Sequence, residues 1–423
     1  MKKSILVAFA ALFTLSASAE GYQVNTLSAK QLGMGHTSVS QKLNSESVWF
    51  NPAAAAYQEQ KFTVSAGVTG IMATATCTTA NDYTNPTTTY TSDNDWSTPI
   101  YFYANYKVND NLALGLSFNT PFGSSMNWGT DWVGASLVQS ISLTSYTAQP
   151  TISYKMLDGK LSFGAGLMMV WGNYEQSKNL YTGAADVTMS GDAGLKFGVN
   201  VGVMYDINDQ WSLGASYRSK VMMEVNEGQA EITYAAGYEA VLSQYFAFMT
   251  NGFSAELPLP ATLSVGATYY PADRWTLSTE VQWVQWNAYE SLDINFSDYG
   301  VISYDKNYSN TIMFRVGGQY EISDFITGRL GFYVDQSPVA SDYLNPETPS
   351  MTKVAYTGGV SIMPCKNNRS FSIDLAYAYI TSADPERAGS CPLSVNSDGT
   401  VNAFSANYTT KAHTASIGLS WGF

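Results

Sequence analysis

Apolar residues alternate with small or polar residues over many segments of this chain. At the C-terminus one set of alternate positions holds His413, Ala415, Ile417, Leu419, Trp421 and Phe423, whereas the positions between them are threonine, serine and glycine. A period of two gives a β-strand one apolar face and one polar face. A single such strand also fits a soluble sandwich, but many strands of this length favour a barrel with lipid outside and a polar lumen inside.

The alternation predicts about fourteen strands, an even number that suits a closed antiparallel barrel. The predicted fold class is therefore all-β, a transmembrane barrel formed by residues 61–423. Short connections alternate with seven long ones, which we assign to the periplasmic and the extracellular end, with both termini periplasmic. The expected strands lie near residues 61–72, 100–107, 112–120, 144–154, 161–172, 194–206, 211–220, 261–270, 275–287, 310–320, 325–335, 353–363, 370–381 and 410–423.

The N-terminus and the composition indicate an exported protein of low charge. Residues 1–19 combine two lysines, a short apolar run and the small residues Ala17-Ser18-Ala19, which is typical of a signal peptide cleaved before Glu20. Aromatic residues make up 14% of the chain and charged residues only 13%, against roughly 25% charged residues in soluble domains. We therefore predict a monomeric, multi-pass β-barrel in the outer membrane of a Gram-negative bacterium, in contact with its lipid and lipopolysaccharide.

Residues 20–60 precede the first predicted strand and include the apolar stretch VWFNPAAAAY. Pro52 is incompatible with a central strand, and the stretch is too apolar for an exposed linker. The lumen of a fourteen-stranded barrel is wide enough to hold such a segment. We therefore predict that residues 20–60 form a plug inside the lumen, called the hatch below, and that the protein is not a general porin.

Several motifs then point to a family. They are the pair Gly21-Tyr22, the spaced glycines Gly33 and Gly35, and the motif Asn51-Pro52-Ala53. In this context they resemble the N-terminal region of the FadL-type outer-membrane transporters of long-chain fatty acids, a family that includes TodX-like proteins for aromatic hydrocarbons. The resemblance covers nearly the whole mature chain, because segments 119–134, 259–270, 283–286 and 333–338 also look like family segments.

The resemblance implies passive, hatch-gated uptake of long-chain fatty acids or other hydrophobic compounds. Ligand would be captured at the extracellular loops, move to an interior pocket and leave sideways into the outer membrane. The hatch motif would comprise Trp49, Phe50, Asn51, Pro52 and Ala53. The alternative is a surface adhesin or receptor whose extracellular loops bind a partner. The hatch favours transport, because an adhesin does not need a plugged lumen.

Two long loops supply candidates for an extracellular groove. Loop 221–260 has apolar residues near helical spacing, which predicts an amphipathic helix, and loop 121–143 would form the facing wall. The alternative is that these side chains pack on neighbouring loops as a lid. The candidates are Tyr238, Leu242, Tyr245, Phe246 and Met249 on the helix, with Phe122, Trp128 and Trp132 opposite.

An interior pocket is predicted from apolar and basic residues at the alternate strand positions that are expected to face the lumen. Met168, Val170 and Met313 suit variable hydrophobic ligands, although packing against the hatch explains each of them as well. A ligand carboxylate needs a cation, because an unpaired buried charge is costly. The parity suggests Arg315, Arg329, Lys196 and Arg218, and the resemblance adds Lys178 and Lys306. Each of these could instead form a salt bridge to the hatch or to an inward carboxylate such as Glu280 or Asp374.

The sequence favours neither an enzyme nor a cofactor or metal site. His413 lies on the outward parity of its strand, and His36 belongs to the hatch without a serine or aspartate at a defined spacing. Gly33 and Gly35 are not part of a strand–turn–helix unit that could bind a nucleotide. The net charge of −13 disfavours nucleic-acid binding.

The three cysteines lack the Cys-x-x-Cys spacing of a zinc site. Cys77 and Cys391 fall in the first and last outer loops, which barrel closure makes neighbours, so a disulfide between them is a candidate. Cys365 lies in a predicted periplasmic turn and is expected to stay unpaired. Calcium binding by loop carboxylates is left open.

Overall fold

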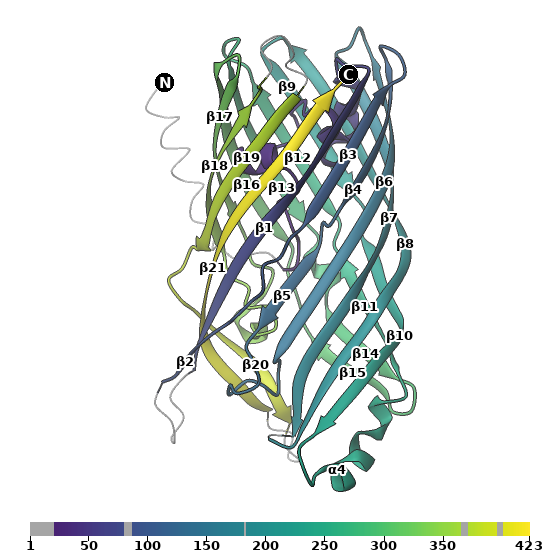
Figure 1. Cartoon of the computed structure of the whole chain (residues 1–423), viewed down its shortest axis with the longest axis vertical. Coiled ribbons are helices and arrows are strands. Elements are labelled where there is room, and N and C mark those ends of the chain that lie inside the picture. The colour runs from purple at the N-terminus through teal and green to yellow at the C-terminus, as the bar shows by residue number, and fades with distance from the viewer. Residues whose placement is uncertain (1–20, 80–86, 182, 365–370, 396–400) are drawn as a thin grey trace.

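The chain forms a tall, closed antiparallel β-barrel in a computed structural model (Figure 1). The structure describes residues 21–79, 87–181, 183–364, 371–395 and 401–423, so the predicted signal peptide and Cys365 lie outside the described residues. Closure occurs between the first and last strands, β1 and β21, which pair from Thr63↔Gly422 to Thr79↔Ala406. The predicted fourteen-stranded barrel is confirmed.

The fourteen wall strands are β1 (Phe62–Thr79), β3 (Ile100–Lys107), β4 (Leu112–Asn119), β6 (Ser140–Met156), β7 (Leu161–Tyr181), β8 (Ala185–Asn208), β9 (Trp211–Arg218), β12 (Thr262–Tyr269), β13 (Trp275–Val284), β16 (Thr311–Ser323), β17 (Ile326–Asp335), β18 (Lys353–Ile362), β19 (Phe371–Ser382) and β21 (Val401–Gly422). Their alternation has the expected sense, because Ile417, Leu419 and Trp421 are each 48% exposed on the outer surface, whereas Ser416 and Gly418 at the alternate positions are buried. The C-terminus lies at the end with the short turns, and the long hairpins and α4 extend from the other end (Figure 1).

The predicted long loops contain structure that the strand count left out. Seven further strands extend or flank the wall at the end expected to be extracellular. They are β2 (Thr89–Thr91), β5 (Gly123–Asn127), β10 (Val221–Tyr234), β11 (Phe253–Leu259), β14 (Ser291–Phe296), β15 (Gly300–Asp305) and β20 (Arg387–Val395). Strand β8 continues beyond β9 to pair with β10, and β11, β14 and β15 follow in the same sheet. Loop 221–260 was therefore wrongly assigned without strands, although the helix predicted within it exists as α4 (Glu239–Phe246), followed by η3 (Ala247–Met249).

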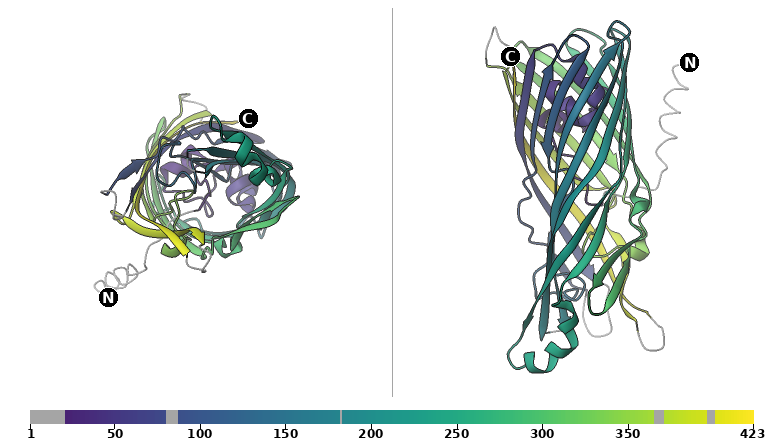
Figure 2. Two further views of the ribbon diagram at one scale, coloured as in Figure 1. Left: turned by 90° about the horizontal axis from the view of Figure 1, so that it is seen from below. Right: turned by 90° about the vertical axis from the view of Figure 1, so that its right-hand side faces the viewer.

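The hatch lies inside the barrel near the end that carries the C-terminus (Figure 2). It contains α2 (Ala29–Gly33), η1 (Asn44–Glu46), α3 (Ser47–Phe50) and η2 (Pro52–Tyr57). Two further short 3-10 turns, η4 (Trp286–Ala288) and η5 (Ser341–Tyr343), lie outside the hatch in the outer connections. No helix among the described residues is long and apolar enough to cross a membrane.

Glycines on the lumen face of the wall let the hatch backbone approach it closely. A Cβ atom on Gly164 would lie 2.3 Å from the carbonyl carbon of Pro52, and one on Gly317 would lie 2.1 Å from the carbonyl oxygen of Met34. These distances are too short for any side chain, so the wall needs glycine there. The small residues on the lumen face of the strands are therefore required by close contact with the hatch as well as by exposure to water.

Candidate functional site

Asn51 ties the hatch motif to itself and to the wall. Its side-chain amide donates to the carbonyl oxygens of Val39 (2.6 Å) and of Val203 in β8 (3.1 Å), and its Oδ1 accepts from the Ala53 backbone amide (3.1 Å). Pro52 occupies the first turn of η2, where a missing N–H costs nothing. Asn51 therefore bonds to backbone groups at the turn that Pro52 begins.

Three of the six predicted lumen cations, Arg315, Lys196 and Lys306, are paired with carboxylates. Arg315 donates to Glu280 at 2.7 Å, and the other oxygen of Glu280 accepts from the hatch amides of Ser38 (2.8 Å) and Val39 (2.9 Å). Met313 packs against this pair, with its sulfur 3.1 Å from Nε of Arg315. The salt-bridge alternative is therefore confirmed for Arg315.

Lys196 is also paired with a carboxylate, whereas Arg329 is connected to one only through a serine. Lys196 pairs with Glu224. Arg329 donates to Gln319 and to Ser361, and Ser361 in turn bonds to Asp374. On the hatch itself, Lys30 lies 3.4 Å from Glu46 and 3.5 Å from Asp374, which fastens α2 to the wall.

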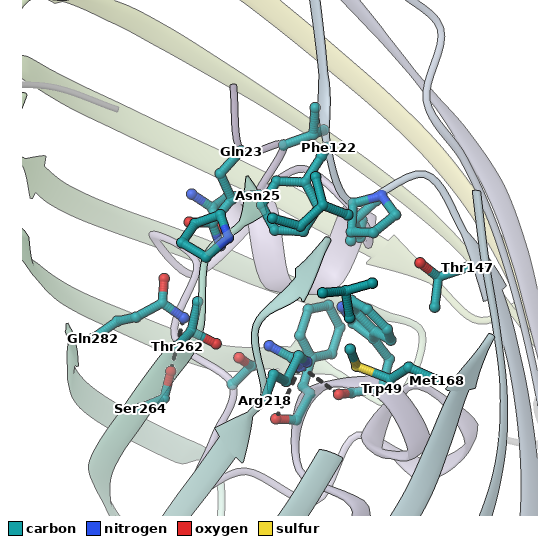
Figure 3. Close-up of a pocket in the computed structure, with 18 of the residues that line it drawn as sticks. Gln23, Asn25, Trp49, Phe122, Thr147, Met168, Arg218, Thr262, Ser264 and Gln282 are labelled. Carbon is teal, nitrogen blue, oxygen red and sulfur yellow. Dashed lines mark hydrogen bonds between the residues drawn. The ribbon is translucent and has the colours of Figure 1, made fainter. Parts of the chain in front are cut away.

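A narrow interior cavity of about 40 Å³ lies between the hatch and the wall (Figure 3). The hatch contributes Trp49 and Phe50, which are both almost fully buried. The wall contributes Met168 and Val170 from β7 and Arg218 from the end of β9. The structure thus brings the predicted hatch aromatics and two of the predicted interior residues to one cavity.

Arg218 is the exception among the cations of this cavity. Its guanidinium lies over the ring of Trp49 at 4.3 Å and donates to the carbonyl oxygens of Trp49 and Phe50. Its Nε is buried without a hydrogen-bond partner. Within the described residues Arg218 forms no ion pair with a carboxylate, whereas Arg315 in the same cavity does. A buried guanidinium of this kind retains the capacity to bind an anion.

An apolar cavity of about 60 Å³ lies closer to the extracellular end. Its walls come from β6, β8, β10, β11 and β14 and from the hatch residue Tyr22. The apolar side chains lining it include Leu143, Met223, Val225, Phe253 and Ile294. Tyr22 closes it toward the hatch, packing edge-on against Trp286 at 5.0 Å and Tyr289 at 5.8 Å.

Lys306 and Glu347 form a buried ion pair at the edge of this apolar cavity. Burial alone would raise the pKa of Glu347, but the adjacent ammonium outweighs it and the pKa is lowered. Burial would lower the pKa of Lys306, but the carboxylate outweighs it and the pKa is raised. The predicted cation Lys178 bonds to the hydroxyl of Tyr304 at 2.9 Å and does not line either cavity described so far.

The barrel wall is interrupted between β1 and β6. Strand β4 ends at Asn119, and after Pro121 the chain continues as β5, which pairs with β6 alone. On the other side of the interruption, residues 97–99 follow β1 through the bridge Ile71↔Ser97. Proline cannot donate to a ladder, so Pro121 explains the break.

This interruption, which we call the window, is closed above and below by hydrogen bonds. At the extracellular side the Asp93 amide donates to the Asn127 carbonyl oxygen at 2.8 Å. At the periplasmic side the Ile100 amide donates to Thr120 at 3.2 Å. A cavity of about 730 Å³ reaches the window from the lumen, and it is lined by hatch residues 23–26 and by Trp96 and Tyr146 at the outer surface.

The hatch N-terminus lies against the inner side of the window. Gln23 and Phe122 form an antiparallel bridge, with the Val24 amide donating to Pro121 at 2.8 Å and the Gly123 amide donating to Tyr22 at 2.9 Å. Gln23 and Phe122 line both the interior cavity and the window cavity. This bridge therefore separates the interior cavity from the window.

The residues predicted to form an extracellular groove do not lie together at one cavity. Trp128 and Trp132 stack at 5.0 Å and bond through their indole N–H groups to loop carbonyls, and neither lines the three cavities above. Leu242 of α4 and Met249 of η3 are buried and Phe246 is half-buried, whereas Tyr245 of α4 and Tyr238 just before it are exposed. Of the eight predicted groove residues, only Phe122 lines any of these cavities, namely the interior cavity and the window cavity.

The candidate disulfide is not formed, because both Cys77 and Cys391 are free, buried thiols. Cys77 pairs with Tyr408 of β21, and Cys391 pairs with Phe404 on the opposite side of the same strand. A whole strand therefore stands between β1 and β20, which separates their backbones by roughly 9–10 Å. A disulfide requires Cα atoms within about 7 Å. The prediction placed both cysteines in outer loops, whereas Cys77 lies in β1 and Cys391 in β20, with β21 between them.

Two parts of the site were missed from sequence. Trp286 and Tyr289 belong to the cluster around Tyr22, and a side chain on Gly21 would meet the Trp286 ring at 2.6 Å. The window was also missed, although Pro121 inside a strand pattern is a signal for it. Among the residues that the structure describes, no group of three or more His, Cys, Asp or Glu side chains could hold a metal ion.

Comparison with known proteins gives a consistent result. Residues 10–423 match the family described as "Outer membrane protein transport protein (OMPP1/FadL/TodX)". A "Long-chain fatty acid transport protein" of Escherichia coli is 21% identical and covers 96% of this chain and 97% of its own. The crystal structure of a Pseudomonas aeruginosa FadL homologue has a TM-score of 0.81 at 20% identity, over 96% of this chain and 100% of that chain. The Pseudomonas putida toluene transporter TodX gives 0.70 at 16% identity, over 96% and 99%.

Proposed function

Because this chain belongs to the OMPP1/FadL/TodX family of outer-membrane transport proteins, we propose that it takes up hydrophobic compounds passively through its lumen. The protein is an outer-membrane β-barrel, and its family is one of transporters rather than enzymes. The printed names of relatives include a fatty acid transporter and a toluene transporter. We propose the same broad class of ligand here, carried by a monomer surrounded by lipid and lipopolysaccharide.

The observation that carries this proposal is the series of three cavities with one segment between them. The apolar cavity adjoins Tyr22, the narrow interior cavity adjoins Gln23 and Asn25, and the window cavity adjoins Gln23 to Thr26. A hydrophobic ligand gains free energy by leaving water for the first of these cavities. It then passes Tyr22, enters the interior cavity and leaves through the window into the outer leaflet.

Residues 22–24 are the gate in this proposal. Their bridge to residues 121–123 rests on two backbone hydrogen bonds, each worth about 1 kcal/mol net. The rest of the hatch is fastened to the wall by the ion pair Lys30–Asp374, by the hydrogen bonds from the Ser38 and Val39 amides to Glu280, and by close glycine contacts. The N-terminal segment can therefore detach while residues 29–57 stay in place. Displacing Tyr22 would also join the apolar cavity to the interior cavity.

Arg218 is our candidate for the residue that receives a ligand carboxylate. It lies in the interior cavity beside the aromatic side chains of the hatch motif and has no carboxylate partner among the described residues. Arg315 and Lys306, which the sequence also suggested, are already paired. A fatty acid would thus place its head group at Arg218 and its chain along Met168 and Val170.

Radiolabelled oleate uptake tests the proposed function directly. Cells that lack their own fatty acid transporter would carry the full chain or an empty vector, with barrel folding checked by heat-dependent mobility on gels. We expect faster uptake with the full chain. Equal uptake with a correctly folded barrel, for both oleate and toluene, would contradict the proposal.

One observation favours the second candidate function, a surface receptor. Tyr238 and Tyr245 are 47% and 64% exposed on α4, at the far extracellular tip. Exposed aromatic side chains suit binding to another molecule. Replacing both by serine separates the two functions: a receptor would lose its partner, whereas transport through the lumen would continue.

A further inference from the structure

The connection between β17 and β18 crosses the lumen. Its residue Glu347 accepts a hydrogen bond at 2.8 Å from Gln176 of β7. Strand β7 lies on the opposite side of the barrel, because five wall strands separate it from β17 in one direction and six separate it from β18 in the other. We call residues 344–350, the part of this connection that reaches across, the strap.

The two ends of the connection are held together at the wall. Ser337 and Ser350 bond through their hydroxyl groups at 2.8 Å, and Arg387 of β20 donates to the carbonyl oxygens of Ser350 and Val339. Residues 337–350 therefore form a loop with joined ends, an Ω-loop, and loops of this kind often act as lids. The strap can move without separating the wall strands.

The strap itself is stiff. The side-chain oxygen of Asn345 accepts from the backbone amides of Glu347 (3.0 Å) and Thr348 (3.2 Å). Pro346 and Pro349 restrict the backbone on either side of this turn. The strap therefore moves as one unit and keeps its shape.

Polar contacts anchor the strap on the far side of the lumen. Glu347 accepts from Lys306 as well as from Gln176, and all three side chains are largely buried. The indole N–H of Trp128 donates to the carbonyl oxygen of Pro346 at 2.9 Å. Hydrogen bonds between ionised groups are the strongest of these contacts. The position of the strap therefore depends mainly on Glu347.

The strap lies between the apolar cavity and the window cavity. Glu347 and Thr348 line the apolar cavity, and residues 348–350 line the window cavity. The described residues that line both cavities are Thr348 and the wall residues Ser124 and Leu143, which are paired across β5 and β6. The boundary between the two cavities is thus the place where the strap meets this wall pair.

We propose that the strap is a partition that makes a ligand take the gated path, and that release of Glu347 opens a direct path from the apolar cavity to the window. This inference rests on the proposed function. With the strap in place, a ligand in the apolar cavity reaches the window by displacing Tyr22 and passing through the interior cavity. With the strap released, it passes Ser124 and Leu143 and enters the window cavity without meeting residues 22–24. The partition therefore makes uptake depend on the hatch.

The test locks the gate and then releases the strap. A disulfide between Gln23→Cys and Phe122→Cys, in a chain whose native cysteines are replaced by serine, holds residues 22–24 against the wall. Glu347→Gln removes the charged anchor in this locked chain. Asp342→Asn is the matched control, because it removes a carboxylate from the exposed η5 of the same connection. Uptake of radiolabelled oleate is measured for each chain after oxidation and after reduction.

We expect the locked chain and the locked control to take up oleate no faster than cells with an empty vector. The locked chain with Glu347→Gln should take it up at least about tenfold faster than the locked chain, because loss of hydrogen bonds to a charged group shifts the strap toward release by that order. After reduction all three chains should transport, which shows that their barrels are folded. A second strap variant, in which residues 344–349 are replaced by alternating glycine and serine, gives the same readout if the unpaired Lys306 prevents folding of the first.

Three results would overturn the inference and leave the proposed function standing. In the first, the locked strap variants stay at the level of the empty vector although reduction restores their transport. In the second, Asp342→Asn restores uptake as well as Glu347→Gln does, so that the anchor is not the cause. In the third, the locked chain transports as fast as its reduced form, so that the strap does not keep the two cavities apart. Uptake no faster than with an empty vector for every reduced chain would instead overturn both the inference and the proposed function.

Discussion

Gly202 of β8 and Asn51 of the hatch fit together without space for another atom. A Cβ on Gly202 would lie 2.0 Å from Oδ1 of Asn51, the oxygen that accepts from Ala53. Because Asn51 is held by three hydrogen bonds, it cannot turn away from such a Cβ. This contact sets the position of the motif against the wall more strictly than the apolar packing of its neighbours does.

Gly202→Ala is therefore expected to destabilise the hatch by about 1–3 kcal/mol through overpacking. Gly194→Ala is the matched control in the same strand, because a Cβ there meets nothing within 4 Å. Thermal unfolding of the purified barrels in detergent compares the two. Equal unfolding temperatures would contradict the close fit.

Asn51→Ala should cost a similar amount, about 1–3 kcal/mol, because it leaves the carbonyl oxygens of Val39 and Val203 without their donor. The variant also tests the role of the motif in transport. Oleate uptake and unfolding temperature would be measured on the same preparation. Unchanged uptake in a folded but less stable barrel would show that Asn51 serves packing alone.

The barrel could be predicted from sequence because its lipid-facing residues repeat at every second position. All fourteen wall strands follow this rule, as in the run that ends at Trp421. The extension formed by β10, β11, β14 and β15 was missed, because its strands lie in long connections and are interrupted by α4. The position of the hatch was predictable from Pro52 and from the lack of any strand for its apolar stretch.

The site was predictable only in part, and the reason differs from the one that applies to the missed strands. Residue type and parity suggested several lumen cations, but only the structure shows that Arg315 is paired with Glu280 whereas Arg218 is not. Pairing can join residues far apart in the sequence, such as Glu280 and Arg315, which are 35 positions apart, and strand parity does not encode it. The disulfide prediction failed in the same way, since neighbouring loops do not imply neighbouring strands.

Arg218→Gln should lower palmitate uptake and leave hexadecan-1-ol uptake nearly unchanged. Only the carboxylate needs the positive charge, whereas both ligands share the same chain. Lys196→Gln is the control, because Lys196 already pairs with Glu224. Uptake is compared at saturating and limiting ligand, so that a change in affinity is separated from a change in rate. A parallel loss for both ligands would show that Arg218 only holds the hatch.

The Lys306–Glu347 pair predicts a loss of stability in acid. The pKa of Glu347 is lowered below its ordinary value of 4.5, so the folded state binds this proton less readily than the unfolded chain does. The contribution of the pair is fully present above pH 4.5 and is lost as the pH falls through the lowered pKa. Glu347→Gln should remove this part of the acid dependence. Urea unfolding at a series of pH values measures it, and an identical pH profile in the variant would exclude the pair as its source.

Cross-linking residue 23 to residue 122 should close the path reversibly. Gln23 and Phe122 face each other as a non-hydrogen-bonded pair, flanked by the bonds Val24 to Pro121 and Gly123 to Tyr22. Cα atoms at such a pair lie about 4.5 Å apart, within the range that a disulfide spans. The substitutions Gln23→Cys and Phe122→Cys would be made in a chain whose three native cysteines are replaced by serine.

Under oxidising conditions we expect oleate uptake by this double variant to fall to the level of an empty vector, and a reductant should restore it. Gln23→Cys alone is the control for the loss of the glutamine side chain, and Phe122→Cys alone is the control for the loss of the ring. If the oxidised double variant transports as well as the reduced one, the N-terminal segment does not need to leave the window, and residues 22–24 are part of a fixed wall instead of a gate.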